Sequence, residues 1–122
     1  MIKIIDPDRC SAHPMDNDRG ETVHIVNTEL GTENLDIHIN RLRPGGPNGR
    51  LHRHTNSDNV YIVRAGEGRL IAEGKTYTVR KGEIVFIPAG VDHSLCNVSD
   101  AMFEILEIYA PAGRKYDFEF LD

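Results

Sequence analysis

The chain has 122 residues with a formal net charge of −5, of which 39% are hydrophobic and 27% are charged. These values predict one folded domain with a single core. The negative net charge and the lack of any run of Lys or Arg argue against a nucleic-acid partner, whose phosphates need clustered cations. No apolar run approaches the roughly 20 residues of a membrane helix and the N-terminus has no signal-peptide pattern, so we expect a cytoplasmic protein that binds a small molecule and no membrane.

The N-terminal arm, residues 1–20, has the composition of a loop. It contains Pro7, Pro14 and several aspartates, among them Asp6 and Asp16. We expect this arm to cover the edge of a sheet or to pair with another subunit. Residues 21–122 are then a single β domain.

The remaining chain alternates short β-rich segments with turn signals. Each segment is rich in β-branched residues and is bounded by Gly, Pro, Asn or Asp. The predicted strands cover residues 23–26, 35–42, 60–63, 70–72, 76–79, 84–87 and 102–109. Capped helix patterns are missing. About eight short strands at this spacing predict an all-β protein, with a closed or double-sheet antiparallel architecture.

Three histidines in the centre of the chain form a candidate metal site. His52 and His54 make an H-x-H pair, and because strand side chains alternate between faces, both imidazoles project to one side. That arrangement suits a shared ion, and one more imidazole, from His93, would complete a three-histidine site. Cys10 and Cys96 form no C-x-x-C pair, so we expect both to be reduced thiols.

The motifs around these histidines resemble those of the cupin superfamily. The first, G-x5-H-x-H-x3or4-E-x6-G, matches Gly46, His52, His54, position 59 and Gly66, and the second, G-x5-P-x-G-x2-H-x3-N, matches Gly82, Pro88, Gly90, His93 and Asn97. The resemblance implies a small single-domain cupin: a double-stranded β-helix barrel of the jelly-roll type and a homodimer. It also implies a divalent transition metal bound inside the barrel.

The departure from the cupin pattern is Asn59, which stands where glutamate is usual. Strand alternation turns Asn59 inward and Asp58 outward. An amide oxygen is a weak neutral ligand, so a metal here would keep more positive charge and acidify bound water further. Among Zn, Ni, Cu, Mn and Fe this favours the first three. The alternative is that the site has lost its metal and Asn59 is a hydrogen-bonded core amide.

Candidate catalytic residues follow from the same alternation. Tyr61 shares the face of Asn59 and can donate a proton, unless it is simply part of the core. On the last strand Glu107 and Tyr109 share a face. If that face lines the cavity, Glu107 has a raised pKa and acts as a general base, with Tyr109 beside the substrate. If the strand has the opposite phase, Glu104 is the inward carboxylate, and the sequence leaves the two open.

The other polar side chains of the strands are expected on the outside. His38 and Asn40 should face either solvent or the mouth of the barrel, with solvent favoured. Arg53, which lies between two candidate ligands, must point outward by alternation. Arg41 and Arg43 are candidate carboxylate binders, although solvated charges are commoner.

The end of the chain is similar to that of small cupins that linearise unsaturated uronates. The similarity lies in the segment from Leu106 to Pro111 and in Arg114. It implies that Glu107 takes the place of a catalytic aspartate and that Arg114 binds substrate, while the amide of those enzymes is glutamine where this chain has Asn59.

These interpretations favour a metal-dependent enzyme of the cupin type. It would be an isomerase or lyase acting on a sugar acid or similar carbonyl compound, in which the metal polarises an oxygen while a side chain moves a proton. The alternatives are a metal-dependent cupin dioxygenase, against which Asn59 counts, and a non-catalytic metabolite-binding cupin.

Overall fold

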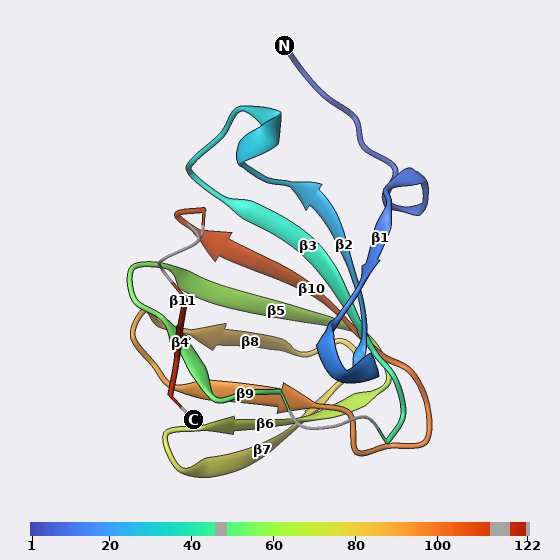
Figure 1. The fold of residues 1–122 in the computed structure, drawn as a ribbon, viewed down its shortest axis with the longest axis vertical. Helices are drawn as coiled ribbons and strands as arrows, with labels where there is room; N and C mark the ends of the chain where they lie inside the picture. Colours follow the sequence, from blue (N-terminus) through green and yellow to red (C-terminus); the bar gives the residue numbers. More distant parts are fainter. Residues whose placement is uncertain (46–48, 113–117, 122) are drawn as a thin grey trace.

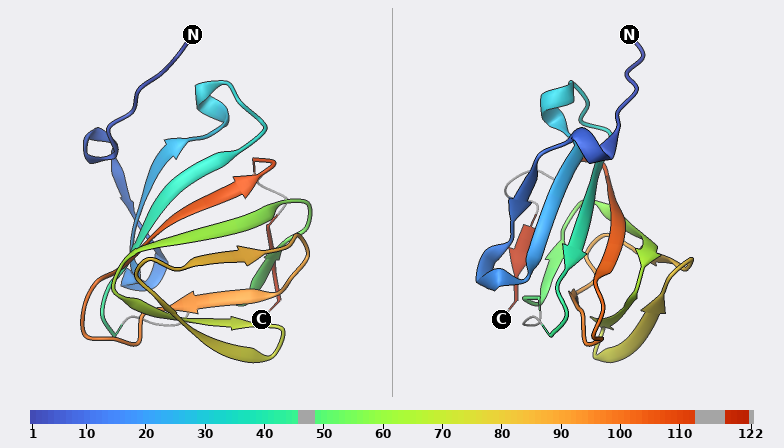
Figure 2. Two further views of the ribbon diagram at one scale, coloured as in Figure 1. Left: turned by 180° about the vertical axis from the view of Figure 1, so that it is seen from behind. Right: turned by 90° about the vertical axis from the view of Figure 1, so that its right-hand side faces the viewer.

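The computed structural model describes residues 1–45, 49–112 and 118–121. The strands form two antiparallel sheets that pack face to face (Figures 1 and 2). The predicted all-β, jelly-roll architecture is therefore confirmed. No described segment forms a helix that is both long and apolar enough to cross a membrane.

The larger sheet has six strands in the order β1-β2-β3-β10-β5-β8. Its strands are β1 (Ala12–Pro14), β2 (Gly20–Val26), β3 (Asp36–Leu42), β10 (Phe103–Ala110), β5 (Asp58–Ala65) and β8 (Ile84–Ile87). The smaller sheet has the order β11-β4-β9-β6-β7. Its strands are β11 (Phe118–Phe120), β4 (His52–His54), β9 (His93–Cys96), β6 (Glu67–Ala72) and β7 (Lys75–Arg80). Three short 3-10 helices precede β3: η1 (Pro7–Arg9), η2 (Asp16–Asp18) and η3 (Thr28–Leu30).

All seven strands predicted from the β-rich segments are present, and β5 is longer than predicted at both ends. The strands β1, β4, β9 and β11 lie outside those segments. Strand β1 belongs to the N-terminal arm and pairs antiparallel with β2, so the arm lies along one edge of the larger sheet, which is one of its two expected positions. Cys10 and Cys96 are both free thiols.

The core fills the space between the two sheets. Its ten residues come from seven different strands: Leu42, Tyr61, Val63, Leu70, Ala72, Val79, Ile87, Leu95, Phe103 and Ile105. The motif glycine Gly66 connects β5 to β6 with a φ of +76°, and a Cβ at this position would collide with the carbonyl oxygen of Met102. Glycine is therefore required where the chain crosses from one sheet to the other.

Strand β10 lies between β3 and β5 and determines what the larger sheet presents to the interior. Its register places Glu107 opposite His38 of β3 and opposite Tyr61 of β5. Because directly opposed residues project from the same face of a sheet, these three side chains form a row across the inner surface.

Candidate metal centre

Strands β4 and β9 of the smaller sheet bring the three histidines together. His52 and His54 share the inner face of β4, and the register of β4 with β9 sets His52 opposite His93. One ring nitrogen from each histidine lies within 4.8 Å of the others. His54 and His93 are buried and His52 is half-buried at the cavity. The clustering predicted from the motifs is present.

Backbone carbonyls hold two of the rings with the proton on Nδ1, so that Nε2 is the nitrogen without a proton. Nδ1 of His52 donates to the carbonyl oxygen of Arg50 at 2.7 Å, and Nδ1 of His93 donates to that of Val91 at 2.9 Å. Because a carbonyl only accepts, the proton of each neutral ring must lie on Nδ1. Burial, with the neighbouring His93, lowers the pKa of His52 to about 4, and burial lowers the pKa of His93 as well. Both rings are therefore neutral at pH 7, as metal ligands must be.

Asn59 faces the histidines from β5 of the opposite sheet. Its side chain is 1% exposed, and Nδ2 lies 3.4 Å from Nε2 of His93. Its Oδ1 is buried and has no hydrogen-bond partner among the described residues. A cation among the imidazoles would satisfy that oxygen if the amide turned Oδ1 toward the ring nitrogens. Three imidazole nitrogens and one amide oxygen are a donor set that fits a divalent transition metal.

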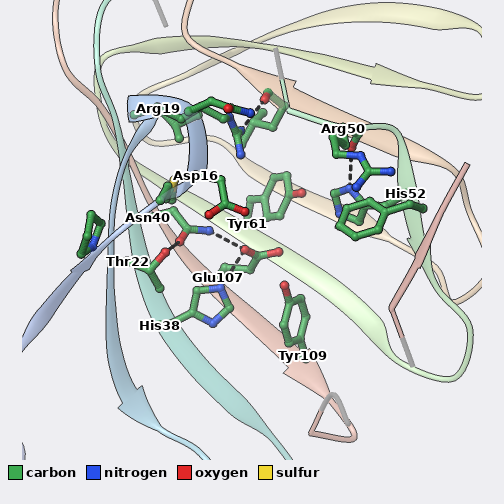
Figure 3. A pocket seen from close by; sticks show the side chains of 16 residues that line it. Asp16, Arg19, Thr22, His38, Asn40, Arg50, His52, Tyr61, Glu107 and Tyr109 are labelled. Atoms are coloured by element: carbon green, nitrogen blue, oxygen red, sulfur yellow. Dashed lines mark hydrogen bonds and ion pairs between the residues drawn. The ribbon is translucent and has the colours of Figure 1, made fainter. Parts of the chain in front are cut away.

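Glu107 is the inward carboxylate of β10, which resolves the phase that the sequence left open. It is 4% exposed, whereas Glu104 lies on the other face, where Oε1 accepts from Nε of Arg41 at 2.6 Å. Oε1 of Glu107 accepts two hydrogen bonds, from Nε2 of His38 at 2.9 Å and from Nδ2 of Asn40 at 2.8 Å (Figure 3). Two donors on one oxygen hold the carboxylate in a single orientation.

The expectation of a raised pKa for Glu107 is wrong. Burial raises the pKa of this carboxyl, but the positive charge of His38 and hydrogen bonds from His38 and Asn59 outweigh it and lower the pKa to about 2. The raised pKa was expected from the apolar neighbours of Glu107 on β10. The cation that reverses the shift lies on the adjacent strand β3, where the sequence does not place it. Glu107 is therefore ionised at neutral pH.

Of the two positions expected for His38 and Asn40, the favoured one, solvent, is wrong, because both residues line the cavity. His38 is 6% exposed, and its Nδ1 donates to Oδ1 of Asp36 at 2.9 Å. Burial lowers the pKa of His38, but Glu107 and Asp36 outweigh it and raise the pKa to about 9. Asn40 is held by Thr22, whose Oγ1 donates to its Oδ1 at 2.8 Å. This face of β3 lines a cavity together with residues 14–17 and 19 of the N-terminal arm, which alternation within β3 could not reveal.

Two tyrosines complete the polar part of the cavity. The ring of Tyr61 lies 6.4 Å from that of His93, and the ring of Tyr109 lies 4.3 Å from that of His54. Burial and the charge of Glu107 raise the pKa of both phenols. Both hydroxyls therefore remain protonated and can act as hydrogen-bond donors.

A cavity of about 520 Å³ connects these groups and is lined by His52, Tyr61, Glu107 and Tyr109 together with residues 14–17 and Arg19 of the N-terminal arm. Arg19 belongs to no motif and no strand pattern of the sequence, so its place in the cavity was not predicted. Arg114, predicted to bind substrate, lies outside the described residues.

The other arginines considered from the sequence lie away from the cavity. Arg41 pairs with Glu21 as well as Glu104, and Arg43 pairs with Asp18. Arg53 pairs with Glu119 and points outward, as alternation predicted. All three therefore have carboxylate partners at the surface.

Comparison with known proteins places the chain in a family. Residues 38–109 match the family model of the cupin domain. An uncharacterised protein from Methanocaldococcus jannaschii is 28% identical over 79 residues, or 65% of this chain and 63% of that protein, so the match spans less than two thirds of that relative. An oxalate-binding protein from Thermotoga maritima is 25% identical over 104 residues, covering 85% of this chain and 86% of that protein.

A solved structure with a similar fold is the polyketide cyclase RemF from Streptomyces resistomycificus. It superposes with a TM-score of 0.84 at 18% identity, covering 100% of this chain and 87% of that one. At this identity the likeness concerns the fold alone.

Proposed function

The chain belongs to the cupin domain family, and from that premise we propose that it is a metal-dependent enzyme, an isomerase or lyase acting on a sugar acid or similar small carbonyl compound. One observation carries the proposal. An ionised buried carboxylate, Glu107, lines the same cavity as His52 of the three-histidine cluster. A proton acceptor and a cation site that share one cavity are the two parts that such chemistry needs.

The residues that would hold the metal are His52, His54 and His93 through ring nitrogens, and Asn59 through Oδ1. A bound divalent metal would supply Lewis acidity that polarises a carbonyl or hydroxyl oxygen of the substrate. Neutral imidazoles and an amide leave the full charge of the ion in place. The hydrogen bonds of His52 and His93 to backbone carbonyls keep both rings oriented in advance.

Glu107 is the proton acceptor in this proposal. It is ionised before substrate arrives, so no separate deprotonation step is needed. With a pKa of about 2 it is a weak base, and it therefore suits a proton on a carbon or hydroxyl already acidified by an adjacent polarised oxygen. His38 and Asn40, which both donate to Oε1, are positioning residues that aim the carboxylate into the cavity.

Tyr61 and Tyr109 would supply hydrogen bonds to the substrate. Both phenols stay protonated, and both rings lie beside candidate metal ligands. A phenol in that position can donate to a substrate oxygen as negative charge develops on it, which stabilises the transition state. Tyr61 is opposite Glu107 in the register of β5 with β10, so donor and acceptor approach the substrate from one wall.

The experiment is to load the purified protein with Zn, Ni, Cu, Mn or Fe and incubate it in D2O with sugar acids and hydroxy-carbonyl compounds. Proton abstraction next to a carbonyl exchanges solvent deuterium into the substrate, which NMR detects. We expect exchange with at least one compound, which chelation of the metal should abolish. Oxygen uptake would instead indicate a dioxygenase. Binding without exchange would indicate a metabolite-binding protein, as the name of the oxalate-binding relative describes for that protein.

A further inference from the structure

Arg19 enters the cavity from the N-terminal arm, between η2 and β2. It lines the same space as Tyr61 and Glu107 (Figure 3). Nη2 donates to the carbonyl oxygen of Leu95 at 3.1 Å. Nε is buried without a hydrogen-bond partner, and within residues 1–45, 49–112 and 118–121 no carboxylate forms an ion pair with Arg19. The guanidinium thus has unused donors inside the molecule.

A partly buried cation without a counter-charge is unfavourable by itself. Burial lowers the pKa of Arg19, which reflects lost hydration, although a guanidinium stays charged at any working pH. The neighbouring Arg43 pairs with Asp18 at 2.7 Å. Because the described part of the chain supplies a carboxylate for Arg43 and none for Arg19, an anion from outside the chain is the group that would complete the hydrogen bonding of Arg19.

The charges around the cavity support the same conclusion. Glu107 shares the positive charge of His38 with Asp36, since each carboxylate lies 2.9 Å from one ring nitrogen. Asp16 is exposed at the rim, and the guanidinium of Arg50 lies 3.6 Å from the ring centre of Phe120 at the same rim. A divalent ion among the histidines would add further positive charge. With that ion in place the cavity would attract anions even though the whole chain carries a net charge of −5.

The backbone around Arg19 holds its side chain in place. A Cβ on Gly49 would lie 2.7 Å from Nη2 of Arg19 and 2.8 Å from the carbonyl oxygen of Leu95. The lack of a side chain at Gly49 therefore leaves room for the guanidinium of Arg19 next to the backbone. The backbone NH of Arg43 also donates to the carbonyl oxygen of Arg19 at 2.8 Å. Such prior ordering reduces the entropy that a ligand must pay on binding.

We propose that Arg19 and Tyr61 form a carboxylate-binding subsite of this cavity, so that the ligand is a small organic anion with its carboxylate on Arg19. Tyr61 is near both groups, since it lines the same cavity as Arg19 and its ring is 6.4 Å from that of His93. The phenol can therefore donate to the ligand beside the guanidinium. The inference deepens the proposed function and rests on it for the second contact, between another ligand oxygen and the metal.

The test compares carboxylates with their uncharged amides in calorimetric titrations of metal-loaded protein. The panel is pyruvate, malonate, D-glucuronate and D-galacturonate, each with the corresponding amide. At least one carboxylate should bind more tightly than its amide. Arg19→Gln should weaken that carboxylate about tenfold or more, because it removes a charge-assisted hydrogen bond, and should leave the amide and the metal content unchanged.

Two further variants guard against indirect effects. Arg43→Gln removes the same charge a short distance away on the surface and should bind every compound as the wild type does. Arg19→Lys keeps the charge without the planar fork and should lose less affinity than Arg19→Gln. The subsite is refuted if no carboxylate binds better than its amide, or if Arg19→Gln keeps the full carboxylate affinity with an unchanged melting temperature.

Failure of this inference can be told apart from failure of the proposed function. If carboxylates bind in a manner that depends on Arg19 but no deuterium exchange occurs, the subsite is supported and the proposed enzyme activity is refuted. Deuterium exchange into a substrate whose affinity is the same in wild type and Arg19→Gln would support the proposed enzyme and refute the subsite.

Discussion

Nε2 of His38 lies 2.9 Å from Oε1 of Glu107 across the neighbouring strands β3 and β10, and both side chains are buried. The other ring nitrogen of His38 contacts Oδ1 of Asp36, also at 2.9 Å. Because carboxylates only accept, both nitrogens must carry protons, and the ring is an imidazolium between two carboxylates. This arrangement keeps Glu107 ionised and fixed in orientation beside the candidate metal centre.

The first prediction concerns how the free energy of unfolding depends on pH. The pKa of His38 is raised from 6.5 to about 9, so its contribution is complete below pH 6.5 and is lost as the pH rises through 9. The pKa of Glu107 is lowered from 4.5 to about 2, so its contribution is present above pH 4.5 and is lost as the pH falls through 2. Urea unfolding of metal-free protein should therefore show a loss of roughly 3 kcal/mol between neutral and alkaline pH.

The control for this prediction is His38→Gln, which keeps a hydrogen-bond donor to Glu107 without the charge. It should be less stable than the wild type at pH 6 and should lack the alkaline loss. An identical pH dependence of the unfolding free energy in the two proteins would show that the charge of His38 is not the cause of the alkaline loss.

The second prediction concerns metal content. His52→Ala and His93→Ala should each lose most of the bound metal, because the three ring nitrogens lie within 4.8 Å of one another and form one site. Mass spectrometry of the purified proteins measures this directly. His24→Ala changes an exposed histidine and should keep the full metal content. A folded His93→Ala variant with one full equivalent of metal would place the ion elsewhere.

The third prediction concerns the amide at position 59. Asn59→Glu should hold its metal more tightly against a chelator, since a carboxylate adds charge attraction, while turnover should fall with the Lewis acidity of the site. Asp58→Asn, a change on the exposed residue next to it, should alter neither. Unchanged chelator resistance and turnover in Asn59→Glu would mean that the side chain does not ligate.

The fourth prediction separates the two carboxylates of β10. Glu107→Gln should retain metal and lower turnover by about 10²-fold or more, a usual effect of removing one acid-base group. Glu104→Gln affects a carboxylate that pairs with Arg41 and Arg64 outside the cavity and should leave turnover nearly unchanged. Equal, small effects of both changes on turnover would favour the metabolite-binding alternative.

Much of the candidate site could be predicted from local patterns. The H-x-H pair of His52 and His54 needs only strand alternation, and the motif spacing around His93 placed the third imidazole. The same alternation turned Asn59 and Tyr61 inward, and both are buried. Whether this site binds a metal remains a prediction.

The sequence by itself determined the strand content, the turns and the inner faces of β4 and β5, because these depend on neighbours one or two residues away. Only the tertiary structure decided the surroundings of Glu107. The phase of β10 was ambiguous, since both of its faces carry a glutamate, and the charge of His38 acts on Glu107 across 69 positions of sequence. The same holds for Arg19, which an arm with the composition of a loop carries into the cavity. The pKa of a group and the shape of a binding site depend on which charges the fold places nearby. That proximity follows from strand register rather than from local pattern.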